Sequence, residues 1–228
     1  MVTDGLNPFT LLAFLGAVAA TGVGGIAIAV ALYLKRPDFA RRIVWWGGGA
    51  WGAYLGLLVV GSLTSGDRLL APQEEKHICE VDCHLAYSVV GTRTATTLGE
   101  GPHAATAQGR YYVVTVRVRF DSETISSRRA RDLPLSPNPR TVALVDGQGR
   151  QFGLARAGQR AIPAAPGEAR PLTRILFPGE SYTADLVFDV PADARNLRLV
   201  LEAAGPHALI IGHERSLWHG KTTFRIEA

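Results

Sequence analysis

The sequence lacks most of the features that would point to a particular chemistry. Its 228 residues include only two cysteines and one methionine. It contains no phosphate-binding loop, no G-x-S-x-G or H-E-x-x-H motif and no EF-hand loop. The carboxylates Asp146, Asp185 and Asp189 fall in turns or on solvent-facing strand positions. These absences argue against an enzyme, and no cofactor is expected.

The sequence also lacks a basic run interleaved with aromatic residues. The net charge is +4, and arginine outnumbers lysine 21 to 3. A nucleic-acid-binding surface usually shows as a clustered basic patch. Nucleic acid is therefore excluded as an expected partner.

Two long stretches lack charge altogether: residues 10–34 and residues 43–65. At ~1.5 Å rise per residue, each is long enough for a helix that crosses the ~30 Å hydrocarbon core of a bilayer. The preceding segment, 1–9, contains Asp4 and no basic residue, unlike the start of a cleaved signal peptide. The sequence thus predicts two retained transmembrane helices.

The connection between these stretches, residues 35–42, carries four basic residues: Lys35, Arg36, Arg41 and Arg42. Short cytoplasmic loops are enriched in lysine and arginine. We therefore expect this loop inside a bacterial inner membrane, with residues 1–9 and everything after residue 65 on the periplasmic side.

Small residues recur at a spacing of four along both predicted helices, which places each set on one helix face. The set comprises Gly16, Ala20, Gly24, Gly48, Gly52 and Gly56. Small residues let helix backbones approach closely in membranes. The two helices could pack on each other through these faces, or one face could dock onto other membrane subunits.

Beyond a polar linker at 66–76, the hydrophobic period changes to two, and residues 77–228 are predicted to form one all-β domain. In residues 111–120, Tyr112, Val114, Val116, Val118 and Phe120 share one face. A turn at 146–149 predicts a hairpin, and 181–190 repeats the alternation. Further strands are expected at 84–90, LRLVLE, HALIIG and TTFRIE. Residues 121–140 and 153–171 are expected to be long loops, which are often functional.

The strand YYVVTVRVRF, the Asp-Gly hairpin and the run FPGESYTADLVFDVP together resemble the telokin-like, immunoglobulin-type domains of bacterial exported and lipid-anchored proteins. The resemblance covers roughly residues 83–201. It implies an immunoglobulin-like β-sandwich outside the cytoplasm, and it implies no activity.

The run HICEVDCH holds both cysteines and allows four interpretations. Cys79 and Cys83 could form a disulfide, as an oxidising compartment permits. With His84, and with His213 or His219 as remote ligands, they could bind copper or zinc. The C-x3-C-H pattern could attach haem. Both cysteines could also be structural thiols.

The copper interpretation draws on layout, because two helices before an outer β-domain resemble subunit II of cytochrome oxidase, whose copper motif has C-x3-C spacing. Here His84 follows the second cysteine directly, and no methionine ligand exists. Three functions remain open. The first is a non-catalytic accessory subunit of a larger membrane complex, of respiratory or photosynthetic type, whose partners are lipid and other subunits. The alternative is electron transfer or copper handling through Cys79, Cys83 and His84. The third is a solitary ligand-binding or envelope-stress protein.

Overall fold

The computed structural model describes residues 2–4, 8–80, 82–163, 171–205 and 207–227. The chain divides into two compact units. The β unit comprises residues 1–5, 67–205 and 222–228. The helical unit comprises residues 6–66 and 206–221.

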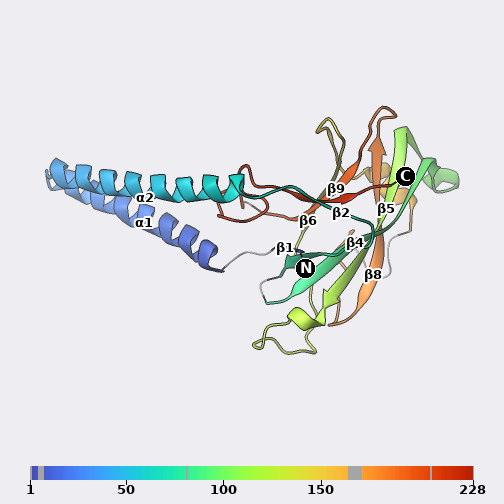
Figure 1. Ribbon diagram of the computed structural model, residues 1–228, viewed down its shortest axis with the longest axis horizontal. Coiled ribbons are helices and arrows are strands. Elements are labelled where there is room, and N and C mark those ends of the chain that lie inside the picture. Colours follow the sequence, from blue (N-terminus) through green and yellow to red (C-terminus); the bar gives the residue numbers. More distant parts are fainter. Residues whose placement is uncertain (1, 5–7, 81, 164–170, 206, 228) are drawn as a thin grey trace. The chain divides into compact units, whose positions relative to one another are not determined.

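The helical unit contains α1 (Pro8–Tyr33) and α2 (Pro37–Leu63), which lie side by side as a hairpin (Figure 1). Both begin earlier than predicted, and the expected loop at 35–42 shrinks to a short turn. The reason is Pro37, whose fixed φ suits the first turn of a helix, so that Arg41 and Arg42 become helical.

The helices contact each other through specific side chains rather than through a continuous small-residue seam. The Trp51 indole donates a hydrogen bond to the Thr21 hydroxyl at 2.8 Å. A Cβ added to Gly24 would lie 3.7 Å from the Ile43 side chain, whereas one added to Gly16, Gly48, Gly52 or Gly56 would meet nothing within 4 Å. Ala20 and Gly48 line an open groove of 710 Å³ between the helices. Most of the predicted glycine faces are therefore left open by the described residues of this chain.

The β unit is a sandwich of two five-stranded sheets. The first sheet has the order β1-β3-β4-β5-β8. Its strands are β1 (Val2–Asp4), β3 (Lys76–Cys79), β4 (His84–Leu98), β5 (Ala105–Asp121) and β8 (Ser181–Val190). The second has the order β2-β10-β9-β6-β7, with β2 (Arg68–Leu70), β10 (Thr222–Arg225), β9 (Arg198–Ala203), β6 (Arg140–Val145) and β7 (Gln151–Phe152).

The core lies between the sheets and follows the predicted alternation. Val114, Val116, Val118 and Phe120 of β5 are fully buried against Leu199 and other side chains of the second sheet. The predicted hairpin of β6 and β7 and the strands β8, β9 and β10 are confirmed. The prediction of a strand at HALIIG is wrong, because residues 207–217 form turns within the helical unit.

Two segments expected to be unstructured contribute strands. Residues 2–4, before α1, form β1, which pairs in parallel with β3. Within the expected linker, residues 68–70 form β2, which pairs in parallel with β10. Three-residue strands give too short a pattern for alternation to reveal them.

A short helix, α3 (Arg156–Ala161), covers part of the outer face of the first sheet within the expected loop 153–171. It buries Tyr111, Val113 and Val187, which the alternation of β5 and β8 places outward. Gly158 is required there, because a Cβ would lie 2.6 Å from a Val187 methyl. The Gln159 side chain bonds the backbone of Asp185 and Val187 and so satisfies the exposed edge of β8.

Candidate functional site

The run HICEVDCH forms the end of β3, a tight turn and the start of β4. Cys79 lies directly opposite His84, and the Glu80 amide donates to the Cys83 carbonyl at 2.8 Å. Because side chains alternate along a strand, Cys83 shares the core face with Leu85, while Cys79 and His84 share the outer face. Cys83 is accordingly 1% exposed and belongs to the core cluster.

The predicted disulfide is absent from the structure, in which neither cysteine is bonded to the other. The strand register supplies the reason, because it directs the two thiols to opposite faces of the sheet. The same register keeps both sulfurs from one metal ion, and burial of Cys83 in the core leaves no room there for a thioether to haem.

The remaining predicted ligands belong to two different units. Cys79, Cys83 and His84 belong to the β unit, and His213 and His219 belong to the helical unit. His213 stacks on His207 with 4.3 Å between ring centroids, and His219 Nδ1 lies 2.8 Å from the Gly220 carbonyl. Among the residues that the structure describes, no three His, Cys, Asp or Glu side chains are placed to hold a metal ion.

The two acids between the cysteines anchor the long loop 121–140. The Arg129 guanidinium donates to both carboxylate oxygens of Asp82, at 3.1 and 3.0 Å. The Ser126 amide donates to the Asp82 carbonyl at 2.8 Å. Burial favours the neutral acid, but the Arg129 hydrogen bonds prevail and hold the pKa of Asp82 below its ordinary value. The loop is therefore fixed to the turn.

Glu80 points inward and forms a buried ion pair with Arg140, the first residue of β6. The side chains of Glu80 and Arg140 are 1% and 2% exposed. Asn138 also donates to Glu80, and Arg140 Nε donates to the Tyr87 hydroxyl at 2.9 Å. Burial raises the pKa of Tyr87 to about 12, which keeps it a neutral hydroxyl. This network joins the two sheets through their interior.

The outer face beside the turn holds a hollow of 440 Å³ lined by polar side chains. His77 Nε2 lies 3.3 Å from Asp121, and Arg119 makes a two-pronged contact with Glu75 at 2.7 and 3.1 Å. Burial, together with the nearby His77, lowers the pKa of His84 despite the opposing charge of Asp121. Three carboxylates, those of Glu75, Asp121 and Glu123, line this hollow against the single arginine Arg119, so its lining is acid-rich.

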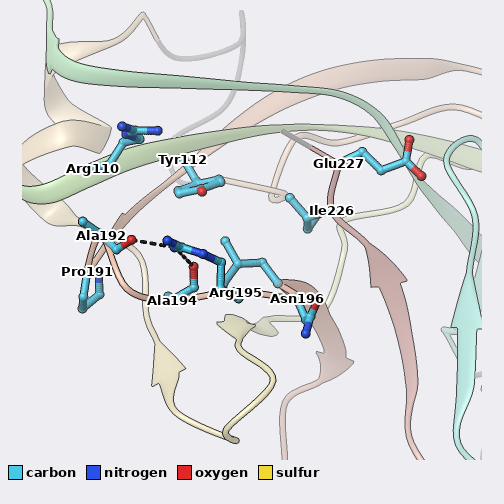
Figure 2. A pocket seen from close by; sticks show the side chains of 10 residues that line it. Arg110, Tyr112, Pro191, Ala192, Ala194, Arg195, Asn196, Ile226 and Glu227 are labelled. Atoms are coloured by element: carbon cyan, nitrogen blue, oxygen red, sulfur yellow. Dashed lines mark hydrogen bonds between the residues drawn. The ribbon is translucent and has the colours of Figure 1, made fainter.

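A second hollow, of 580 Å³, is lined by residues of β5, of the loop that follows β8 and of the segment after β10 (Figure 2). It contains Arg110, Arg195 and Glu227 beside the ring of Tyr112. Arg195 donates to the carbonyls of Ala192 and Ala194 at 2.6 and 2.8 Å, as the dashed lines show. The Arg195 guanidinium is thus held by its own loop, and the hollow carries charges of both signs.

The two thiols should differ sharply in reactivity. We expect a maleimide at pH 8 to modify Cys79 and to spare Cys83 in the folded chain, giving one adduct by intact mass. Burial raises the pKa of Cys83 to about 12, so its thiolate fraction at pH 8 is roughly one in 10⁴. Cys79 is partly exposed.

Two controls accompany this labelling. The folded Cys79→Ser variant should give no adduct, and the unfolded wild type should give two. A native chain that gives none until a reductant is added would contradict the structure and restore the disulfide.

Glu80, Asp82 and Arg140 are the residues that sequence reasoning missed. The cysteines of CEVDC drew attention to metal and redox chemistry, whereas the acids between them make the contacts. The sequence did contain a signal for these contacts, because two acids in a short turn and several arginines in the loop 121–140 carry opposite charges. Opposite charges on two distant segments predict a contact only when the fold is known to bring those segments together.

Comparison with known proteins gives fold-level similarity alone. The solved structures that are similar include the secreted protein MPT63 of Mycobacterium tuberculosis, at 12% identity over 72% of this chain and 100% of that chain, with a TM-score of 0.44. The yjhA protein of Bacillus subtilis matches at 13% identity over 69% and 99%, with a TM-score of 0.40. A conserved hypothetical protein of Bacillus anthracis matches at 14% over 55% and 86%, also at 0.40. No protein-family model and no curated protein matches the chain.

Proposed function

We propose that the chain is a non-catalytic accessory protein of a bacterial inner membrane. The α1–α2 hairpin crosses the bilayer, and the β-sandwich lies on the periplasmic side, where it contacts protein partners. The host is a larger membrane assembly, of which respiratory and photosynthetic complexes are the expected classes.

The surface of the hairpin carries this proposal. α1 and α2 have 26 and 27 residues, or ~39–41 Å at ~1.5 Å per residue, against the ~30 Å of a hydrocarbon core. Their large apolar side chains point outward, among them Leu12, Val23, Ile26, Trp45, Trp46 and Val60. A continuous apolar surface of this extent needs a covering phase, and lipid provides it.

Strand pairing supports the proposed topology. β1 precedes α1 and β3 follows α2, yet the two strands pair in one sheet. Residues 2–4 and 76–79 therefore lie on the same side of any membrane that both helices cross. The turn between the helices, with Lys35 and Arg36, lies on the opposite side, which the positive-inside rule assigns to the cytoplasm.

The same contacts support retention of α1 rather than its removal as a signal sequence. Cleavage after α1 would remove β1 from its sheet and the Thr21 partner of Trp51 from the hairpin.

A patch on the β-sandwich suits a protein partner. Leu135 and Leu176 form an antiparallel bridge between two loops, and three large apolar side chains are exposed beside it. We call Leu133, Ile175 and Phe177 the bridge patch. Apolar and aromatic side chains with neighbouring arginines, here Arg174, are typical of interface centres.

Alkaline carbonate extraction tests the membrane claim. The chain should stay in the membrane pellet and be released only by detergent. Val23→Arg, on the lipid-facing middle of α1, should reduce carbonate-resistant protein, because a central arginine costs ~2.5–3.5 kcal/mol on insertion scales. Leu34→Arg, beyond the end of α1, is the matched control and should insert normally. Release of the wild type by carbonate would refute the anchor.

Purification from native membranes tests the accessory role. Wild-type chain should bring defined partner subunits, and the double variant Leu133→Ser, Phe177→Ser should lose them while it remains folded and membrane-bound. Equal recovery of partners with the double variant would remove the bridge patch from the proposal. A wild-type chain that purifies alone after crosslinking would contradict the accessory role itself.

A further inference from the structure

The connection between β9 and β10 folds onto the outer end of α2 instead of extending the sandwich. We call residues 207–221 the outer loop. The Tyr54 hydroxyl of α2 donates to the Leu209 carbonyl at 2.6 Å, and the Gly220 amide donates to the Ser65 hydroxyl at 2.7 Å. Between these contacts, the Ile211 side chain lies 3.5 Å from the position of a Cβ on Gly61. The outer loop therefore follows α2 from its end inward.

The contact with Tyr54 sets the depth of the outer loop if α2 spans the bilayer. Tyr54 lies nine residues before the end of α2 at Leu63, ~14 Å along the helix axis. The helix is ~41 Å long and exceeds a ~30 Å hydrocarbon core by ~5 Å at each end. Tyr54 and the Leu209 carbonyl then lie roughly 9 Å below the outer boundary of the hydrocarbon.

Irregular backbone can lie at that depth only when its polar groups are satisfied within the protein. The outer loop meets this requirement for four successive carbonyls at its deepest residues. The carbonyls of His207, Ala208 and Ile210 accept hydrogen bonds from backbone amides farther along the loop at 3.0–3.2 Å. The fourth carbonyl of the run, that of Leu209, is bonded by Tyr54.

Three polar residues of the outer loop, His213, Glu214 and Ser216, are buried, and Arg215 is half-buried. The large apolar side chains of Leu217 and Trp218 are 44% and 69% exposed. Trp218 has a φ of 61°, a left-handed conformation that a bulky residue adopts only under constraint. Tryptophan is enriched at membrane–water interfaces. A strained backbone that holds an exposed indole outward therefore points to a function for that indole.

We propose that the outer loop is a membrane-inserted loop. Residues 208–211 enter the outer leaflet beside α2, and Leu217 and Trp218 contact lipid at the boundary between headgroups and acyl chains. The ligand is the phospholipid of the periplasmic leaflet. This inference rests on the proposed function, because it needs α2 to span the membrane.

Spin labelling in lipid vesicles tests the proposal. The full chain, with Cys79→Ser and Cys83→Ser, is reconstituted in vesicles of phosphatidylcholine and phosphatidylglycerol. A nitroxide is attached at Leu217→Cys, and its collision rates with oxygen and with a water-soluble nickel chelate are compared. Leu57→Cys, exposed on α2 and ~9 Å before the end of the helix, is the lipid reference. Thr183→Cys, exposed on β8, is the water reference.

Position 217 should resemble position 57, with oxygen favoured over nickel. If position 217 resembles position 183 while position 57 remains lipid-like, the outer loop is outside the membrane and the inference fails, although the anchor stands. If position 57 is water-like as well, the membrane span and the inference both fail.

A second readout does not depend on labelling. Brominated phospholipid should quench wild-type tryptophan fluorescence more than that of Trp218→Phe, whose remaining indoles are Trp45, Trp46 and Trp51. The intensity lost in the variant comes from those three indoles, so an equal absolute loss in the two proteins would mean that Trp218 is not quenched. That result would place Trp218 in water and overturn the inference.

Discussion

Val116→Asp is expected to unfold the β-sandwich. Val116 is fully buried in β5, between Val89 of β4 and Ala184 of β8. An unpaired carboxylate at this position would cost more than the ~5–15 kcal/mol by which a typical domain is stable. Near-ultraviolet circular dichroism and limited proteolysis of the detergent-solubilised chain should show loss of the β-sandwich with the helices retained.

Thr183→Asp is the matched control for this substitution. Thr183 lies on β8 opposite Arg117 and is exposed on the outer face, so an added carboxylate remains hydrated beside a positive charge. Its free energy of unfolding should change by less than ~0.5 kcal/mol. Equal damage from both substitutions would refute the assignment of strand faces.

Arg140→Met is expected to destabilise the β-sandwich by ~3–5 kcal/mol, because it leaves the buried Glu80 carboxylate without its cationic partner. Asn138 would be the remaining donor among the contacts described for that carboxylate. Urea unfolding, followed by tyrosine and tryptophan fluorescence, measures the loss.

The double variant Glu80→Gln, Arg140→Met separates the ion pair from simple packing. Without a charge to strand, it should be more stable than Arg140→Met alone. The free energy of unfolding of Glu80→Gln alone completes the comparison. If the double variant is destabilised by the sum of the two single substitutions, Glu80 and Arg140 are not energetically coupled, and the ion pair does not contribute to the stability of the sandwich.

Sequence patterns predicted the elements whose signal is long and regular. Two uncharged stretches predicted the helices. The period of two in residues 111–120 predicted the buried face of β5, because a strand that is buried on one face has an apolar side chain at every second residue. The same reasoning failed at Tyr111 and Val113. Alternation places both side chains on the outer face of the sheet. They are buried because α3 packs on that face through Gly158 and forms a second, smaller core there.

The candidate site was less predictable than the fold. A spacing of cysteines suggests a disulfide or a metal site, but the strand register decides whether the thiols face each other, and here it separates Cys79 from Cys83. The apolar run HALIIG has the composition of a strand, yet its contacts with Tyr54 and Gly61 assign it to the helical unit. Register and long-range contacts of this kind are properties of the folded chain, and local pattern does not carry them.

The membrane topology is the central claim, and cysteine accessibility in intact spheroplasts tests it most directly. Thr183→Cys and Arg36→Cys are compared, each in the chain with Cys79→Ser and Cys83→Ser, and each is treated with a membrane-impermeant maleimide. We expect position 183 to be labelled in intact spheroplasts and position 36 to be labelled only after lysis. Labelling of position 36, with position 183 protected until lysis, would contradict it.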